Sequence, residues 1–300
     1  MDDIIPQACT LCPRRCKADR RIRQGRCGAG NSLCVARAAL HLWEEPCISG
    51  TDPARGSGTV FFSGCPLGCV FCQNGQISHR GEGVDITPEH LAGIFLRLQQ
   101  EGAYNINLVT PTQYVPWILK ALKLCENKLK IPVLYNSGGY ETVETLRLLE
   151  GKVSIYLPDL KYYDSALSAR YSGAEDYFEF ASTAIPEMFR QTGPVSFNEE
   201  GILQKGMIIR HLVLPGCFKD SIRLLHWIAD HFVPEDIRLS LMSQYTPPVG
   251  LLYKEISRPV FSYEYHKVCD EAAELGFLGY TQERSSANQC YTPAFDGTGV

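Results

Sequence analysis

Three closely spaced cysteines form the strongest chemical signal in this chain. Cys65, Cys69 and Cys72 follow an apolar run with the spacing Cys-x3-Cys-x2-Cys, within eight residues. Thiolates are the usual ligands of iron–sulfur clusters, and one short loop can bring three of them to the same cubane. Three ligands for four irons leave one iron open, and an open position distinguishes a catalytic metal from a structural one. We therefore expect a catalytic [4Fe–4S] cluster on this loop.

Two simpler interpretations of the loop stay open at this point. A structural zinc site would need a fourth ligand nearby, for which His79 is the candidate. A pair of core thiols with a third, unrelated cysteine is the other alternative. Gly64 and Gly68 favour the cluster, because glycine lets the backbone bend and approach the sulfides closely.

A second group of cysteines lies near the amino terminus. Cys9, Cys12, Cys16 and Cys27 have the spacing Cys-x2-Cys-x3-Cys-x10-Cys. Four thiols suit one metal centre, and either zinc or an iron–sulfur cluster is compatible with them. A segment this short and polar cannot fold on apolar burial alone, so a bound metal would stabilise it. Unpaired surface thiols on an ordered tail are the alternative.

The composition limits where such sites could operate. The 300 residues are 45% hydrophobic and 21% charged, as in globular proteins, but they include 13 cysteines. The acidic start of the sequence has no export signal, so we expect a cytoplasmic protein whose clustered cysteines hold metal. A net charge of −4 disfavours nucleic acid as a partner. No apolar run approaches the roughly 20 residues of a membrane helix.

Alternating apolar runs and amphipathic stretches define the elements that must position the cysteines. Strand–helix alternation repeated about six times predicts an α/β fold with a parallel sheet, either an open barrel or a doubly wound sheet. The predicted strands span residues 59–62, 106–109, 132–135, 153–157, 208–214 and 237–241. Predicted helices include residues 114–128, 141–149, 221–231 and 263–275.

The helix after the first strand shows its local signals most clearly. Thr87 can cap it, Pro88 fits its first position, and Gly102 ends it. Its apolar face consists of Leu91, Ile94, Phe95 and Leu98.

Polar residues at the ends of the predicted strands are candidates for ligand binding. Ligands gather at the carboxyl ends of parallel strands in both architectures. We favour a satisfied core histidine for His211, and a position lining a substrate pocket for Gln244 and Tyr245. Asp159 and Lys161 have an alternative role as a pair at a helix start. The strand-end candidates are Asn136, Ser137, Asp159, Lys161 and Arg210.

The cysteine spacing, with the aromatic Phe71 before the last cysteine, resembles the signature of the radical S-adenosylmethionine (SAM) superfamily. Over most of residues 58–245, the chain is similar to activating enzymes of glycyl radical enzymes, particularly a branch like pyruvate formate-lyase activase. The resemblance implies a partial (β/α)6 TIM-like barrel whose open iron is chelated by SAM. It also implies reductive cleavage of SAM to a 5′-deoxyadenosyl radical that abstracts a hydrogen atom.

The same resemblance assigns roles to individual residues. It places Phe71 beside the cofactor and Arg210 opposite its carboxylate. Many family members carry Gly-Gly-Glu after the second strand, where this chain has Thr110 and Thr112 as candidate acceptors for the amino group of SAM. The remaining cofactor residues implied are Asn136, Ser137, Asp159 and Lys161.

These observations predict two parts of the chain. Residues 1–55 form a Cys-rich, metal-binding extension, and residues 56–300 form a radical SAM partial barrel with a C-terminal helix. The first choice of target is the backbone glycine of a glycyl radical enzyme. Maturation of a peptide, cofactor precursor or nucleotide is the second choice, and a non-enzymatic iron–sulfur or zinc protein for electron transfer or docking is the third.

An electron donor such as flavodoxin or ferredoxin is the expected partner of such an enzyme. Arginines around the first cysteine group give that segment a local positive charge, which suits docking of an acidic donor. A solvated surface is the default expectation for these arginines, which are Arg14, Arg15, Arg20, Arg21, Arg23 and Arg26.

Overall fold

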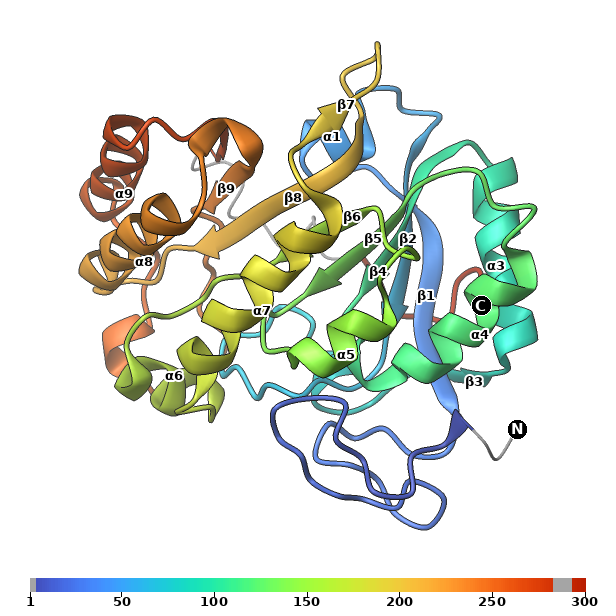
Figure 1. The fold of residues 1–300 in the computed structure, drawn as a ribbon. Coiled ribbons are helices and arrows are strands. Elements are labelled where there is room, and N and C mark those ends of the chain that lie inside the picture. Colours follow the sequence, from blue (N-terminus) through green and yellow to red (C-terminus); the bar gives the residue numbers. More distant parts are fainter. Residues whose placement is uncertain (1–3, 283–292) are drawn as a thin grey trace.

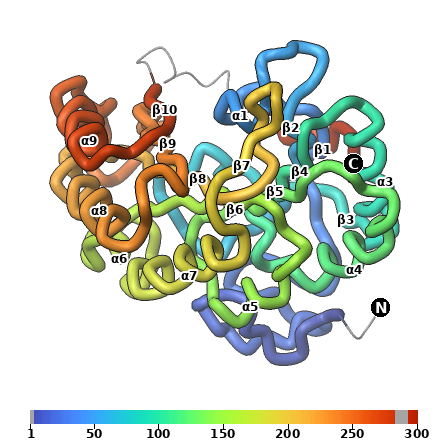
Figure 2. The backbone as a smooth tube through the Cα atoms, turned by 45° about the horizontal axis from the view of Figure 1, so that its top comes forward, coloured from blue at the N-terminus to red at the C-terminus, as the bar shows by residue number. Residues whose placement is uncertain are grey.

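The structure is a computed structural model that describes residues 4–282 and 293–300 (Figures 1 and 2). Its strands are β1 (Leu33–His41), β2 (Gly56–Phe62), β3 (Val84–Ile86), β4 (Ala103–Val109), β5 (Val133–Ser137), β6 (Ile155–Pro158), β7 (Ser196–Phe197), β8 (Leu203–Leu212), β9 (Arg238–Met242) and β10 (Gly279–Thr281). Its α-helices are α1 (Pro46–Ser49), α2 (Gly75–Ser78), α3 (Pro88–Gln100), α4 (Val115–Cys125), α5 (Val143–Leu148), α6 (Ser165–Ser172), α7 (Tyr177–Thr192), α8 (Phe218–His231) and α9 (Ser262–Glu274). Short 3-10 helices are η2 (Thr112–Tyr114), η3 (Pro234–Asp236) and η4 (Lys254–Ile256).

One sheet organises the fold. Its strand order in the described residues is β10-β9-β8-β6-β5-β4-β2-β1-β3, with β7 beside β8. From β2 to β9 the neighbouring strands are parallel and follow the order of the chain. A doubly wound sheet would reverse that order around its first strand, so the winding is that of a barrel. The sheet is not closed, which confirms the predicted partial barrel.

The six predicted strands correspond to β2, β4, β5, β6, β8 and β9. The structure adds β1, which pairs antiparallel with β2 on one side and with β3 on the other. Residues 33–41 were expected within the Cys-rich extension, but they continue the sheet. The extension is therefore joined to the barrel by shared strand pairing as well as by the chain.

Helix α3 forms as its sequence predicts. The Thr87 hydroxyl accepts a hydrogen bond from the backbone N–H of His90 at 3.2 Å, and Pro88 occupies the first turn. The predicted apolar face is buried against the sheet. Helices α6 and α7 were not predicted. Pro186 lies inside α7, where proline normally interrupts a helical pattern.

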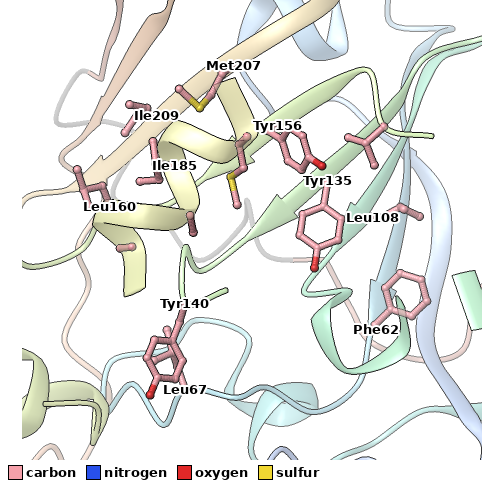
Figure 3. Packing of buried hydrophobic residues seen from close by; sticks show 14 of the residues in the cluster. Phe62, Leu67, Leu108, Tyr135, Tyr140, Tyr156, Leu160, Ile185, Met207 and Ile209 are labelled. Carbon is pink, nitrogen blue, oxygen red and sulfur yellow. The ribbon is translucent and has the colours of Figure 1, made fainter. Parts of the chain in front are cut away.

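Large apolar and aromatic side chains join the helices to the sheet. Figure 3 shows Ile185 of α7 beside Met207 and Ile209 of β8. Tyr135 and Tyr156 pack edge to face on neighbouring strands, with ring centroids 5.8 Å apart. This packing holds the carboxyl ends of the strands at fixed relative positions. Among the described helices, none is both long and apolar enough to cross a membrane.

Gly58 provides a test of the packing around β2. A Cβ added at Gly58 would stand 2.8 Å from the carbonyl oxygen of Asn105 and 2.9 Å from the Cβ of Ala103. We expect Gly58→Val to lower the free energy of unfolding by about 1–3 kcal/mol, because the added atoms overpack the sheet. Chemical denaturation monitored by circular dichroism measures the effect.

Gly93 is the matched control. It is exposed on α3, and a Cβ there meets no described atom within 4 Å. Gly93→Ala should raise the free energy of unfolding by roughly 0.5–1 kcal/mol through helix propensity. Equal effects of the two substitutions would contradict the close packing at Gly58.

Candidate functional site

The cysteine loop leaves the carboxyl end of β2 and is held on both sides by backbone hydrogen bonds. The N–H of Cys65 donates to the carbonyl of Cys27 at 3.0 Å, and the N–H of Gly68 donates to the carbonyl of Ser172 at 3.2 Å. Gly64 has a φ of 81°, and a Cβ there would stand 2.3 Å from the Cys27 carbonyl oxygen. Gly64 is therefore needed where this loop meets the amino-terminal segment, a different contact from the approach to the sulfides predicted for it.

Each of the three sulfurs accepts a hydrogen bond from the protein. Such bonds stabilise thiolate ligands and tune iron–sulfur clusters. The donors are the Ser172 hydroxyl to Cys69 at 2.9 Å, the Ser78 hydroxyl to Cys72 at 3.3 Å and the backbone N–H of Leu67 to Cys65.

The electrostatics of the trio favour a bound cation. Burial raises the pKa of Cys65, and the neighbouring thiols of Cys69 and Cys72 raise it further. Burial also raises the pKa of Cys69. Metal binding removes this penalty, because the positive charge of the metal compensates adjacent thiolates.

A cluster and a single metal ion require different separations between the ligand sulfurs. Within residues 4–282 and 293–300, no three His, Cys, Asp or Glu side chains converge on a site for one ion. Zinc ligands with Zn–S bonds of about 2.3 Å would stand about 3.8 Å apart. In a cubane, each cysteine binds its own iron, so the sulfurs lie farther apart. Among the described residues, the three loop cysteines and His79 do not form a site for one ion.

The cysteine loop opens into a cavity of about 460 Å³. Ligand pockets typically measure roughly 300–1,000 Å³. The cavity is lined by the three loop cysteines and by all residues predicted to contact the cofactor except Thr112. The latter, from the ends of five strands, are Phe71, Thr110, Asn136, Ser137, Asp159, Lys161 and Arg210.

Lys161 and Asp159 form an ion pair inside this cavity, with Nζ and Oδ2 2.5 Å apart. Burial lowers the pKa of Lys161, but the Asp159 carboxylate and the Cys69 thiol outweigh it, so the pKa is raised. The ammonium group is therefore charged at neutral pH and lies near the cysteine loop. The two side chains pair, as the alternative interpretation expected, and they also line the cavity.

Arg210 lies on β8 and is paired with two carboxylates that the sequence analysis missed. Its guanidinium donates to Glu45 at 2.8 and 2.7 Å and also to Glu44. A cofactor carboxylate would have to share or displace these partners, so its contact with Arg210 stays a prediction. The only feature of the sequence that could have indicated these partners is the pair of adjacent acidic residues before Pro46, in the segment assigned to the extension.

Thr110 and Thr112 differ in their surroundings. Thr110 lines the cavity and has a φ of 56°, a conformation that is strained for a β-branched residue and that concentrates at functional sites. Thr112 is buried, and its hydroxyl donates to Glu141 at 2.6 Å. Thr110 is thus the better placed of the two for a cofactor contact.

Three other expectations have definite outcomes. His211 is a satisfied core histidine, as predicted, because its ring nitrogens bond the Leu160 carbonyl and the Ser221 hydroxyl at 2.6 and 2.8 Å. Burial lowers its pKa to about 4. Gln244 lines the cavity. Tyr245 instead packs against Phe71, with ring centroids 5.9 Å apart.

The four amino-terminal cysteines lie outside the cavity. They belong to an irregular segment, which has no helix or strand in the described residues from Cys9 to Cys27 and is drawn in dark blue below the sheet in Figure 1. The expectation that the arginines of this segment are solvated is wrong for Arg20, which is only 1% exposed. Its guanidinium stacks on Trp117 at 4.7 Å from the ring centroid.

Comparison with known sequences identifies the family. The profile of the Radical SAM superfamily matches residues 59–190, which include the cysteine loop and the ends of β4, β5 and β6. The "Uncharacterized protein MJ0674" of Methanocaldococcus jannaschii is 30% identical over 277 residues, covering 88% of this chain and 74% of that protein. The chain belongs to the radical SAM superfamily. Membership implies a [4Fe–4S] cluster and SAM, and the loop cysteines with their hydrogen-bond donors fit that cluster.

Solved structures agree on the fold. Streptococcus suis SuiB superposes with a TM-score of 0.52 at 16% identity, over 76% of this radical SAM chain and 48% of SuiB. A radical SAM methyltransferase from Sphaerobacter thermophilus gives a TM-score of 0.53 at 13% identity, over 77% of this chain and 67% of the methyltransferase. The chain therefore spans about half the length of SuiB, and at these identities the likeness shows the fold alone.

Glu141 beside the site provides a test of its electrostatics. It is buried, accepts hydrogen bonds from Thr112 and Tyr135, and has a pKa raised from 4.5 to about 7, chiefly by burial. The folded state therefore binds this proton more tightly than the unfolded state. Stability from this group is present below pH 4.5 and is lost as pH rises to about 7, by up to about 3 kcal/mol.

Glu141→Gln should flatten this part of the stability profile, because the amide does not titrate. Denaturant unfolding of both proteins at several pH values between 4.5 and 8 measures the difference. A wild-type stability that rises relative to the variant across this window would contradict a raised pKa.

Proposed function

We propose that this chain binds a [4Fe–4S] cluster on Cys65, Cys69 and Cys72, binds SAM in the adjoining cavity and abstracts a hydrogen atom from a substrate. The observation that carries the proposal is that the cysteine loop and the strand-end residues line the same cavity. When bound, the reduced cluster supplies the electron that cleaves SAM into methionine and the 5′-deoxyadenosyl radical that takes the hydrogen atom.

The residues of the chain would divide the remaining tasks. Three cysteines would leave one iron free for SAM on the cavity side. Asn136 and Ser137 offer amide and hydroxyl groups to the polar end of SAM. The Lys161 ammonium would compensate the negative charge of the cluster, since it lies close enough to the Cys69 thiol to influence its pKa.

Exclusion of water is a second requirement, because a carbon radical must not be quenched. Phe71 is buried, and its ring packs against Tyr245. This aromatic pair would help to keep water from the loop that carries the three cysteines.

The side chains at the rim of the cavity favour a polypeptide as the target. Gln73, Gln244 and Gln282 line the cavity, and the Gln282 amide donates to the Gln244 side chain at 3.2 Å. Primary amides have both donors and acceptors, which suit the N–H and C=O groups of a peptide backbone. A glycine in a glycyl radical enzyme is our first candidate, and maturation of a peptide is the second. SuiB, which shares the fold, has been crystallised with its precursor peptide SuiA.

The electron would come from a reduced carrier such as flavodoxin or ferredoxin. Exposed basic side chains surround the amino-terminal cysteines and would attract an acidic carrier. These side chains are Arg15, Lys17, Arg23 and Arg26.

Cleavage of SAM tests the proposed chemistry. The anaerobically reconstituted, dithionite-reduced protein should convert SAM into 5′-deoxyadenosine and methionine, measured by liquid chromatography. The triple variant Cys65→Ala, Cys69→Ala, Cys72→Ala should fall to the uncatalysed background, because the cluster has lost its ligands. Cys125→Ala is the matched control, since Cys125 is buried in α4 and its thiol bonds the Ala121 carbonyl at 3.2 Å. Product formation by the triple variant at the wild-type rate would refute the proposal.

Electron paramagnetic resonance tests the glycine target. Candidate glycyl radical enzymes mixed with the reduced protein and SAM should develop a glycyl radical signal, and the triple variant should produce none. Cleavage of SAM without any radical on these partners would reject the glycine target and leave the cleavage chemistry standing.

A further inference from the structure

The amino-terminal cysteines form a compact loop that the function proposed above does not use. The loop closes on itself, since the N–H of Cys9 donates to the Ala18 carbonyl and the N–H of Lys17 donates to the Cys9 carbonyl, both at 3.0 Å. Cys9, Cys12 and Cys27 are buried, and Cys16 is half-buried. Burial of several thiols in a short polar segment is explained when they bind a metal that stabilises the segment.

Backbone amides point at the sulfurs of this loop. Three of the four cysteines accept a hydrogen bond from the N–H two residues later in the chain, which is the arrangement of Cys65 and Leu67 in the cluster loop. These bonds join Arg14 to Cys12, Ala18 to Cys16 and Ala29 to Cys27. Amide donors of this kind stabilise thiolate ligands.

Gly25 keeps a space open between two of the sulfurs. A Cβ added there would stand 3.4 Å from the Cys27 sulfur and 3.6 Å from the Cys16 sulfur. Both sulfurs therefore face the same small volume, which a side chain at this position would fill.

A buried positive charge lies beside the loop. Arg20 is 1% exposed and donates to the carbonyls of Gly30 and Gln113, and within the described residues its Nη2 has no hydrogen-bond partner. Its guanidinium is close enough to the Cys27 thiol to influence it. A buried guanidinium with no carboxylate partner in the described chain calls for a nearby anion. A metal centre with four thiolates carries a net negative charge and would provide one.

We propose that Cys9, Cys12, Cys16 and Cys27 hold a second iron–sulfur cluster. The space beside Gly25 and the buried charge of Arg20 both suit a thiolate centre with a net negative charge. Zinc would draw the sulfurs to about 3.8 Å from one another, whereas a cubane holds them farther apart. The proposal does not depend on the reaction at the cavity.

This second site lies next to the cysteine loop of the cavity. The Cys27 carbonyl accepts a hydrogen bond from the backbone N–H of Cys65, and the Arg14 guanidinium donates to the Pro66 carbonyl at 2.9 Å. The two loops are therefore in direct contact. An iron–sulfur cluster here would be able to exchange electrons beside the cavity, whereas zinc could only brace the fold.

Metal content of the triple variant Cys65→Ala, Cys69→Ala, Cys72→Ala tests the proposal, because this variant keeps only the amino-terminal set. After anaerobic reconstitution with iron and sulfide it should retain about four irons and four sulfides per chain. Adding Cys12→Ala and Cys16→Ala should remove them, whereas adding Cys125→Ala should not. Stoichiometric zinc in place of iron and sulfide, or iron that survives the Cys12 and Cys16 substitutions, would overturn the proposal.

A redox measurement covers the case in which those substitutions unfold the loop. In the triple variant, Arg20→Met keeps an apolar side chain against Trp117 and removes the buried charge. The reduction potential of the cluster should become more negative, because the added electron loses a compensating cation. A reducible centre whose potential is unchanged, or no reducible centre at all, would contradict the assignment.

Discussion

The arrangement of the candidate site depends on the hydrogen bonds that hold the cysteine loop at the end of β2. The loop carries three thiols, and thiols in contact repel one another once ionised, so their positions must be imposed from outside. The backbone of the loop receives this support from the Cys27 carbonyl on one side and the Ser172 carbonyl on the other. Hydroxyl and amide donors then fix each sulfur. Rigid support of this kind keeps a functional group in place before any ligand arrives.

The parallel sheet supplies the second half of the arrangement. Because the strands from β2 to β9 run side by side in chain order, their carboxyl ends form one continuous rim. Residues separated by more than a hundred positions, such as Phe71 and Arg210, come to face the same cavity. The rim combines an ion pair, two carboxylates around an arginine and several neutral polar groups. Such a site can hold a zwitterionic ligand without leaving an isolated buried charge.

The sequence was most informative where structure is determined locally. Apolar runs located the strands from β2 to β9, and the cap at Thr87 located α3, because both depend on neighbouring residues. The cysteine spacing likewise indicated the loop that opens into the cavity. The pairing of Arg210 with Glu44 and Glu45 was not visible, since it joins residues some 165 positions apart. The burial of Arg20 and the strained backbone of Thr110 were also beyond reach, because each depends on tertiary packing.

The contact between Cys27 and Cys65 has a practical consequence for work on the isolated barrel. A shortened version that begins after Cys27 would lose the acceptor for the Cys65 amide, and with it the Arg14 contact to Pro66. Gly64 would then face solvent where it now meets a carbonyl group. Truncation to the family profile, residues 59–190, would keep the contact of the loop with Ser172 but remove its contacts with Cys27 and Arg14. The amino-terminal segment is therefore a structural support for one side of the cysteine loop.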